Sequence, residues 1–165
     1  MRVLGIDPGT ATVGYGVVEG SAVRGRMGSL IECGVLRTHA RDPLPRRLAV
    51  IHEGLRELIA RHAPDVLAVE DIFYATNVRT TIVLGHARGV ILLAGEQAGI
   101  PVASYPPALV KKTVVGRGAA LKPQVGYMVA KLLHLSAAPK PADAADAVAI
   151  ALMHLLAGRR LVAAR

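Results

Sequence analysis

The sequence predicts an α/β fold in which a mixed sheet is flanked by helices. Two observations carry this prediction: strand-like segments crowd residues 2–38, and later strand-like segments alternate with helical ones. A meander followed by such alternation is typical of a mixed sheet with helices on its faces. With 165 residues, 52% of them hydrophobic, the chain can form one domain with a packed core. We expect this domain to cover residues 1–158 and residues 159–165 to form a basic tail.

Three strands are expected in the N-terminal part. Arg2–Asp7 has the pattern of a short buried strand that ends in a charge, and Pro8-Gly9-Thr10 has the composition of a turn. Val13–Glu19 alternates larger apolar residues with glycines, which predicts a returning strand with two different faces. Gly28–Thr38 follows as a third strand, so the three segments predict an antiparallel meander.

Helices and strands alternate in the rest of the chain. Pro45–His62 has the periodicity of an amphipathic helix. Val66–Glu70 is an apolar run ending in a carboxylate, typical of a parallel strand covered on both faces. We then expect a helix at Arg79–Ala98, a strand at Pro101–Tyr105, and helices at Pro107–Val115, Pro123–His134 and Ala142–Ala157.

The segment Arg79–Ala98 is apolar nearly all round, so few solvent-facing positions are expected. Gly85 and Gly89, four residues apart, permit close approach of another helix. Two interpretations remain open: complete burial inside a monomer, or a dimer interface. We expect no membrane span, because His86 and Arg88 interrupt this run.

The charge balance favours a polyanionic partner. Twenty Lys and Arg face twelve Asp and Glu, a net charge of +8. The alternative is that the charge only keeps the protein soluble. Cys33 is the only cysteine, so an internal disulfide is excluded and a cytoplasmic location is the default expectation.

Two carboxylates close predicted strands. Asp7 ends the first strand and Glu70 ends the apolar run. If these strands are parallel neighbours, both carboxylates emerge at the same edge of the sheet, where sites form in α/β folds. The alternative is that each is a strand-end charge turned to solvent.

Two further carboxylates begin the last predicted helix. Asp143 and Asp146 are three residues apart, so they project from one face. Ile150 and Met153 continue that face as an apolar stripe, which should dock on the sheet. The alternative is that the aspartates only complement the helix dipole.

Together, the four carboxylates predict a metal site. Oxygen ligands suit Mg²⁺ or Mn²⁺, and the sequence has no Cys/His set with zinc spacing. Two ions about 3.5–4 Å apart can activate a water molecule and stabilise the leaving oxygen in phosphodiester hydrolysis.

Basic residues cluster in one glycine-bearing segment and include Lys111, Lys112, Arg117 and Lys122. Glycines in this segment allow close backbone approach, and the cations can meet phosphates. A solvated loop without a partner is the alternative.

Five motifs, in order along the chain, resemble the RuvC family of Holliday-junction resolvases. They are Gly5-Ile6-Asp7-Pro8-Gly9-Thr10, Val69-Glu70-Asp71-Ile72-Phe73, Gly85-His86-Ala87-Arg88-Gly89, Val110-Lys111-Lys112-Thr113-Val114-Val115-Gly116 and Ala142-Asp143-Ala144-Ala145-Asp146-Ala147. The resemblance runs from Gly5 to about His154, nearly the whole chain. Each motif alone is weakly specific, whereas all five in register are highly specific.

This resemblance implies a ribonuclease H-like fold and a homodimer that nicks two strands of a four-way DNA junction symmetrically, in recombination and repair. It also implies Mg²⁺ or Mn²⁺ dependence, with two ions per subunit, and ligatable 5′-phosphate and 3′-hydroxyl ends. A branch-migration helicase complex is a further implied partner. The positions of the family's four acidic catalytic residues are occupied by Asp7, Glu70, Asp143 and Asp146.

The resemblance also implies roles for other residues. Phe73 stands three residues after the second carboxylate, where the family has a phenylalanine that stacks on junction bases; a hydrophobic anchor for the loop is the alternative. Lys111 and Lys122 match lysines linked to DNA binding and cleavage, and a lysine near the scissile phosphate would stabilise the transition state. Further candidate DNA contacts are Arg88, Lys112 and Arg117. The role of Asp71, whose side chain should point to the opposite face from that of Glu70, stays open.

Two rival functions remain at this point. Asp7-Pro8-Gly9-Thr10 is also similar to the phosphate loop of sugar-kinase and actin-like ATPases, but those need two such domains. A non-catalytic DNA-binding or scaffold module is the other rival, and it does not require acidic residues that converge on one site.

Overall fold

The computed structural model describes residues 1–21, 27–72 and 77–163, with side chains described up to residue 158. Its core is a five-stranded sheet in the order β3-β2-β1-β4-β5. The strands are β1 (Arg2–Asp7), β2 (Thr12–Gly20), β3 (Gly28–Arg37), β4 (Val66–Glu70) and β5 (Val102–Tyr105). The helices are α1 (Leu44–His62), α2 (Val78–Gln97), α3 (Pro107–Val115), α4 (Lys122–Leu132) and α5 (Ala142–Ala163).

The sheet is mixed, as the sequence predicts. Strands β1, β2 and β3 form an antiparallel meander, whereas β4 pairs parallel with both β1 and β5. Ile6 of β1 lies opposite Val69 of β4, so the two strands end side by side. The expected neighbourhood of Asp7 and Glu70 is therefore confirmed.

Two predicted helix ends are wrong. Helix α4 stops at Leu132 rather than His134, because His134 has a left-handed φ of 55° that the helix cannot accommodate. Helix α5 continues to Ala163 rather than ending at Ala157, because Gly158 takes a helical conformation within a run of good helix formers.

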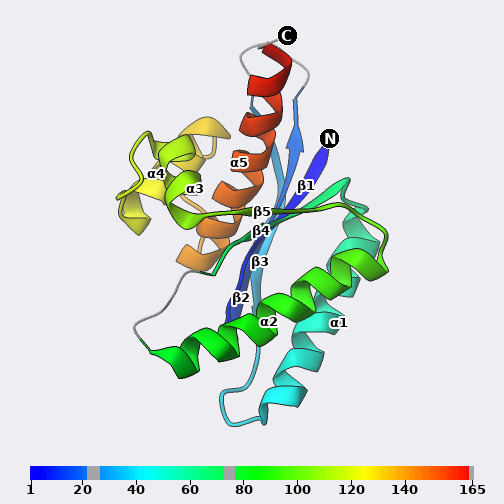
Figure 1. Cartoon of the computed structure of the whole chain (residues 1–165). Helices are drawn as coiled ribbons and strands as arrows, with labels where there is room; N and C mark the ends of the chain where they lie inside the picture. The colour runs from blue at the N-terminus through cyan, green and yellow to red at the C-terminus, as the bar shows by residue number, and fades with distance from the viewer. Residues whose placement is uncertain (22–26, 73–76, 164–165) are drawn as a thin grey trace.

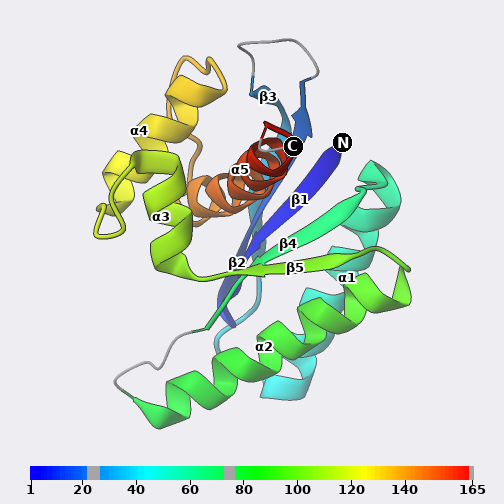
Figure 2. The same cartoon turned by 45° about the horizontal axis from the view of Figure 1, so that its top comes forward.

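Helices cover both faces of the sheet (Figures 1 and 2). Helices α3, α4 and α5 lie on one face, and α1 and α2 lie on the other. The pleat of β1 divides its side chains between the two layers: Val3 packs with the α5 cluster, whereas Leu4 and Ile6 pack with the α1–α2 cluster. The same alternation decides which way the functional side chains at the strand ends point.

Helix α5 lies unusually close to the sheet because small residues separate the two. A Cβ atom on Gly5 would overlap the carbonyl oxygen of Ala147, and one on Gly14 would overlap the carbonyl oxygen of Asp143. Most α5 residues from Ala144 to Leu155 are buried. This packing confirms that the Asp143 end of the helix docks against the sheet, although α3 and α4 bury the helix on more sides than the single predicted stripe.

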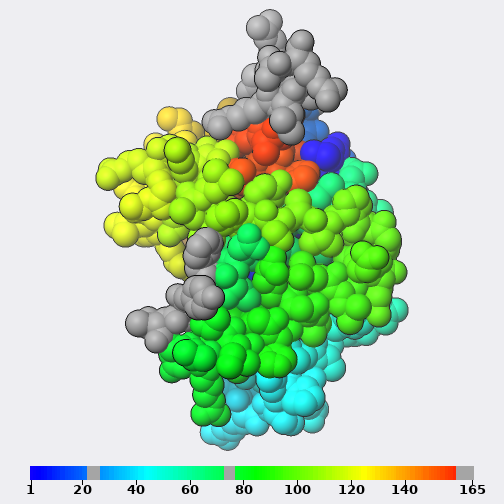
Figure 3. Space-filling model, viewed as in Figure 1, coloured from blue at the N-terminus to red at the C-terminus, as the bar shows by residue number. Residues whose placement is uncertain are grey.

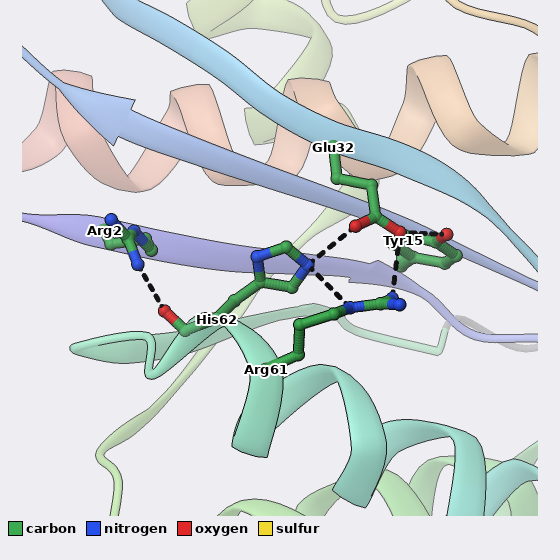
Figure 4. Close-up of polar contacts among 5 residues, drawn as sticks. All are labelled: Arg2, Tyr15, Glu32, Arg61 and His62. Carbon is green, nitrogen blue, oxygen red and sulfur yellow. Dashed lines mark hydrogen bonds and ion pairs between the residues drawn. The ribbon is translucent and has the colours of Figure 1, made fainter.

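A polar cluster ties the end of α1 to the meander (Figure 4). The Tyr15 hydroxyl donates to Oε1 of Glu32 at 2.8 Å, Nη2 of Arg61 donates to the same oxygen at 2.9 Å, and Nε2 of His62 lies 2.8 Å from Oε2. Burial alone raises the pKa of the Glu32 carboxyl, but hydrogen bonds from Tyr15 and His62 and the charge of Arg61 hold the net pKa below its usual value. The cluster thus fixes α1 without involving the carboxyl ends of β1 and β4.

The expectation that α2 has few solvent-facing positions is wrong. Its buried residues are limited to Ala87, Ile91, Ala94 and Gly95, so complete burial within the monomer is excluded. Among its apolar side chains, Val78, Ile82 and Leu93 are exposed. By length and composition alone α2 could also cross a membrane, contrary to the sequence-based expectation. One such helix is weak evidence, because helices of globular domains pass the same test.

Candidate metal-binding site

The side chain of Asp7 points toward α5. Asp7 is the last residue of β1 and shares a sheet face with Val3, which packs in the α5 cluster. Glu70 is the last residue of β4 and shares the same face with Ala68. Because β1 and β4 are parallel neighbours, both carboxylates emerge at one edge of the sheet on the α5 side.

The first two turns of α5 complete an acidic cluster. Asp143 and Asp146 lie over the end of β1, where Gly14 lets the helix approach the sheet. Carboxylate oxygens of Asp7, Asp143 and Asp146 all lie within 4.8 Å of one another. Glu70 lies beyond this set of three but close enough for its charge to act on Asp7. The structure therefore brings together the carboxylates that the sequence singled out.

Burial and like charge make the ionised cluster unfavourable on its own. Desolvation, followed by repulsion from Glu70, Asp146 and Asp143, raises the pKa of Asp7 from 3.8 to about 7, and Lys122 only partly offsets this. Desolvation and repulsion from Asp146 and Asp71 raise the pKa of Glu70 to about 7 against opposing effects of two lysines. A bound cation would remove this repulsion.

Lys122 is the cation nearest the cluster. Its Nζ lies 2.9 Å from Oδ2 of Asp146 and 3.3 Å from Oδ1 of Asp143. The hydrogen bond to Asp146 is the main reason that the pKa of Lys122 is raised above its usual value. Lys111 acts from α3, where its charge lowers the pKa of Glu70. The sequence placed both lysines near phosphate but did not predict the direct ion pairs of Lys122.

The cluster opens to solvent on the α5 side. The side chain of Asp146 is 18% exposed, that of Asp143 is 38% exposed, and that of Lys122 is 57% exposed. Asp7 and Glu70, at the strand ends, are desolvated by burial.

The other predicted DNA contacts differ in their settings. Lys112 on α3 and Arg117 just after it are exposed. Between them, Gly116 ends α3 with a left-handed φ of 88°, a conformation that glycine adopts readily. Phe73 lies outside the described residues, so its stacking role stays a prediction.

Arg88 has contacts that the sequence did not predict. Its Nη2 donates to Oδ1 of Asp71 at 2.6 Å and to the Ser104 hydroxyl at 2.7 Å. Asp71 continues the alternation of β4, so it faces α2, whereas Glu70 faces α5. That alternation was the available signal for the placement of Asp71, but the partner on α2 could not be read from the sequence.

The donor set fits a hard divalent cation. All candidate ligands are carboxylate oxygens, which Mg²⁺ and Mn²⁺ prefer, and they converge where their mutual repulsion is already large. Lys122 supplies only one positive charge there. The protein thus has an acidic cluster that could bind a metal ion.

Comparison with known proteins identifies the family of this chain. The family model described as "Crossover junction endodeoxyribonuclease RuvC" matches residues 3–154. The RuvC of Parafrankia sp. is 48% identical over 165 residues, covering 100% of this chain and 92% of that protein. The structure of Thermus thermophilus RuvC superposes with a TM-score of 0.89 at 37% identity, covering 97% of this chain and 96% of that one.

A second Thermus thermophilus RuvC structure, in complex with Holliday junction substrate, superposes with a TM-score of 0.86 at 36% identity and covers 97% of this chain and 96% of that one. These superpositions confirm the predicted ribonuclease H-like fold of a mixed sheet flanked by helices. This chain belongs to the RuvC family of crossover junction endodeoxyribonucleases.

Proposed function

We propose that this protein is a divalent-metal-dependent endonuclease that resolves four-way (Holliday) DNA junctions by nicking two strands symmetrically, in DNA recombination and repair. The observation that carries the proposal is the convergence of Asp7, Asp143 and Asp146 beside Glu70, with Lys122 at the rim. Family membership supplies the substrate, since a relative of the same fold has been solved with a Holliday junction.

The metal ligands in this proposal are Asp7, Glu70, Asp143 and Asp146, which hold Mg²⁺ or Mn²⁺, two ions per subunit. When bound, the metal supplies Lewis-acid stabilisation of the phosphoryl oxygens and activation of the attacking water. The desolvation of Asp7 and Glu70 supports this role, because carboxylates with raised pKa values gain most from a cation.

Lys122 acts on the phosphate in this proposal. Its ammonium lies at the rim, 57% exposed, and holds Asp143 and Asp146 by ion pairs in the absence of substrate. A lysine in that place can donate to a phosphate oxygen and stabilise the charge that develops in the transition state. We expect products with 5′-phosphate and 3′-hydroxyl ends, as the family resemblance implies, without a covalent protein–DNA intermediate.

Binding of the DNA backbone falls to the basic residues around the site. The net charge of +8 and the exposed side chains of Lys112 and Arg117 support a contact surface for phosphates. We assign Lys111, close enough to lower the pKa of Glu70, to phosphates near the scissile bond. Phe73 is proposed to stack on bases at the crossover. Phe73→Ala should therefore slow junction cleavage and have little effect on the free energy of unfolding.

A homodimer through α2 completes the proposal. Figure 3 shows α2, in green, across the lower front surface, and its exposed Ile82 and Leu93 line a groove of about 430 Å³ together with Leu48 of α1. Gly85 and Gly89 face open space among the described residues, so another helix can approach closely. Two symmetric cuts suit a two-fold axis. A branch-migration helicase partner stays an expectation from the family.

The test compares the wild-type protein with Asp7→Asn and with Glu53→Gln, a control on the exposed surface of α1. Each is incubated with a synthetic four-way junction or a linear duplex of the same sequence, in Mg²⁺ or in EDTA. We expect the wild-type protein to make paired, ligatable nicks in the junction only, and in Mg²⁺ only. Asp7→Asn should cleave at least about a thousandfold more slowly, because its metal would be lost, but it should still bind the junction.

Two results would favour the rival functions. Normal cleavage by Asp7→Asn would contradict the metal assignment and support a scaffold that needs no acidic site. Saturable ATP binding in a nucleotide titration would support the ATPase alternative. The control Glu53→Gln should cleave at the wild-type rate, because Glu53 pairs only with Arg56 in the described structure.

A further inference from the structure

Arg88 joins three elements at a point one residue beyond Glu70. It belongs to α2, and its Nη2 holds both Oδ1 of Asp71, at 2.6 Å, and the hydroxyl of Ser104 on β5, at 2.7 Å. Asp71 follows directly after the last residue of β4. One guanidinium nitrogen therefore ties α2 to the ends of two parallel strands.

The backbone of Asp71 is held as well as its side chain. Its N–H donates to the carbonyl oxygen of Tyr105 at 2.9 Å, and Tyr105 lies opposite Glu70 in the β4–β5 pairing. With its N–H and its carboxylate both engaged, Asp71 fixes the direction of the chain as β4 ends. The preceding residue, Glu70, is thereby held with its side chain on the α5 face.

The setting of Arg88 disfavours a role as a DNA contact. Its side chain is only 22% exposed, and that of Asp71 is 35% exposed. Turning the guanidinium toward a phosphate would break both hydrogen bonds and leave a partly buried carboxylate unpaired beside Glu70. By comparison, Lys112 and Arg117 are exposed and can meet phosphates without losing such partners.

We propose that Arg88, through Asp71, is a positioning residue that holds Glu70 in place for metal binding, rather than a residue that contacts DNA. The proposal rests on the proposed function, in which Glu70 is a metal ligand. Arg88 also lies on the helix whose exposed Ile82 and Leu93 form the proposed subunit interface. The same contacts therefore connect that interface to the strand that carries Glu70.

The test separates metal binding from DNA binding. Arg88→Met is compared with Arg56→Met, which removes the same charge from an exposed pair on α1. Mn²⁺ binding to the protein alone is measured by electron paramagnetic resonance of the free ion, and junction binding is measured in EDTA over a series of salt concentrations. Single-turnover cleavage is then followed against Mn²⁺ concentration.

We expect the Mn²⁺ dissociation constant and the half-saturating Mn²⁺ concentration for cleavage to rise about 10–100-fold in Arg88→Met, the usual effect of losing the partner that orients a ligand. Junction affinity and its salt dependence should match those of Arg56→Met. Arg88→Lys should recover most of the Mn²⁺ affinity, because a lysine also offers one nitrogen to Asp71 and Ser104. Both hydrogen bonds of Arg88 are donated by Nη2, and its buried Nε has no acceptor among the described residues.

Asp71→Asn and the double variant Asp71→Asn/Arg88→Met guard against simple misfolding. If the two residues act as one unit, the double variant should lose no more Mn²⁺ affinity than Arg88→Met alone. Additive losses would overturn the proposal. The proposal would also be overturned if Arg88→Met bound Mn²⁺ with unchanged affinity but bound the junction at least about tenfold more weakly than Arg56→Met. That result is the signature of a lost DNA contact. A wild-type protein that binds Mn²⁺ but leaves the junction uncut would contradict the proposed function instead, and the Mn²⁺ comparison would still test Arg88.

Discussion

Nζ of Lys122 lies 2.9 Å from Oδ2 of Asp146, so a side chain of the protein partly neutralises the acidic cluster. The same ammonium reaches Oδ1 of Asp143 at 3.3 Å. A metal ion at these carboxylates would share them with Lys122 or displace it. Lys122 should therefore oppose metal binding in the free protein, even though it assists the reaction once phosphate is present.

Replacing Lys122 should separate these two effects. Lys122→Met should tighten Mn²⁺ binding to the free protein by about tenfold, the effect of removing one nearby positive charge at a protein surface. The same change should slow single-turnover junction cleavage by about 10²–10³-fold at saturating Mn²⁺, since a donor to the transition state is lost. Calorimetric Mn²⁺ titration and rapid-quench cleavage measure the two quantities.

Lys131→Met is the matched control, because Lys131 is an exposed lysine on the same helix, α4. It should leave both quantities near the wild-type values. Weaker Mn²⁺ binding in Lys122→Met would contradict the idea that this lysine competes with the metal.

The raised pKa values of Asp7 and Glu70 predict how stability depends on pH without metal. Each pKa is about 7 in the folded protein but near 4 in the unfolded chain, so folding is favoured by protonation of these groups. Their contribution is therefore fully present below about pH 4 and is lost as the pH rises through about 7. Thermal unfolding in EDTA should show this loss, and added Mn²⁺ should restore stability most at high pH, because the metal binds the ionised carboxylates.

The variant Asp7→Asn isolates this effect. Since Asn cannot ionise, the metal-free variant should be more stable than the wild type at pH 8, by up to about 4 kcal/mol for a pKa shift from 3.8 to about 7. The difference should vanish near pH 4, and Mn²⁺ should stabilise the variant much less than the wild type. Equal stability of the two proteins at pH 8 in EDTA would mean that Asp7 ionises freely in the fold.

Strand and helix patterns were enough to predict where the carboxylates gather. Asp7 and Glu70 each end an apolar strand, and the pleat gives both the same face once β1 and β4 are known to be parallel. The ion pair between Lys122 and Asp146 could not be predicted, because it depends on how α4 packs against α5. The exposure of α2 could not be predicted either, since an interface helix and a buried helix have the same apolar pattern.

The exposed apolar residues of α2 predict how the oligomer can be disrupted. Ile82→Glu should convert the proposed dimer to a monomer, because it places a charge in the groove shared with Leu93 and Leu48. Sedimentation velocity and light scattering measure the mass. Junction cleavage should then lose its paired nicks, with single nicks left in the product.

Val50→Glu serves as the control for this variant, because Val50 is an exposed apolar residue of α1 beside the buried Ile51. It changes charge and hydrophobicity in the same way outside the groove of α2. A wild-type protein that is monomeric at micromolar concentration, or an Ile82→Glu variant that stays dimeric, would contradict the interface.

The close packing of α5 on the sheet predicts a link between a glycine and the metal site. A Cβ atom at Gly14 of β2 would overlap the carbonyl oxygen of Asp143, so Gly14→Ala must push the start of α5 away from the sheet. We expect a loss of about 1–3 kcal/mol in the free energy of unfolding, typical of overpacking. Mn²⁺ affinity should also fall, because Asp143 and Asp146 move relative to Asp7. Gly158→Ala, within α5 itself and facing open space among the described residues, should instead gain up to about 1 kcal/mol from helix propensity and leave Mn²⁺ affinity unchanged. Denaturant unfolding and Mn²⁺ titration of both variants make the comparison. Unaltered Mn²⁺ affinity in a destabilised Gly14→Ala variant would show that the positions of Asp143 and Asp146 do not depend on this close approach.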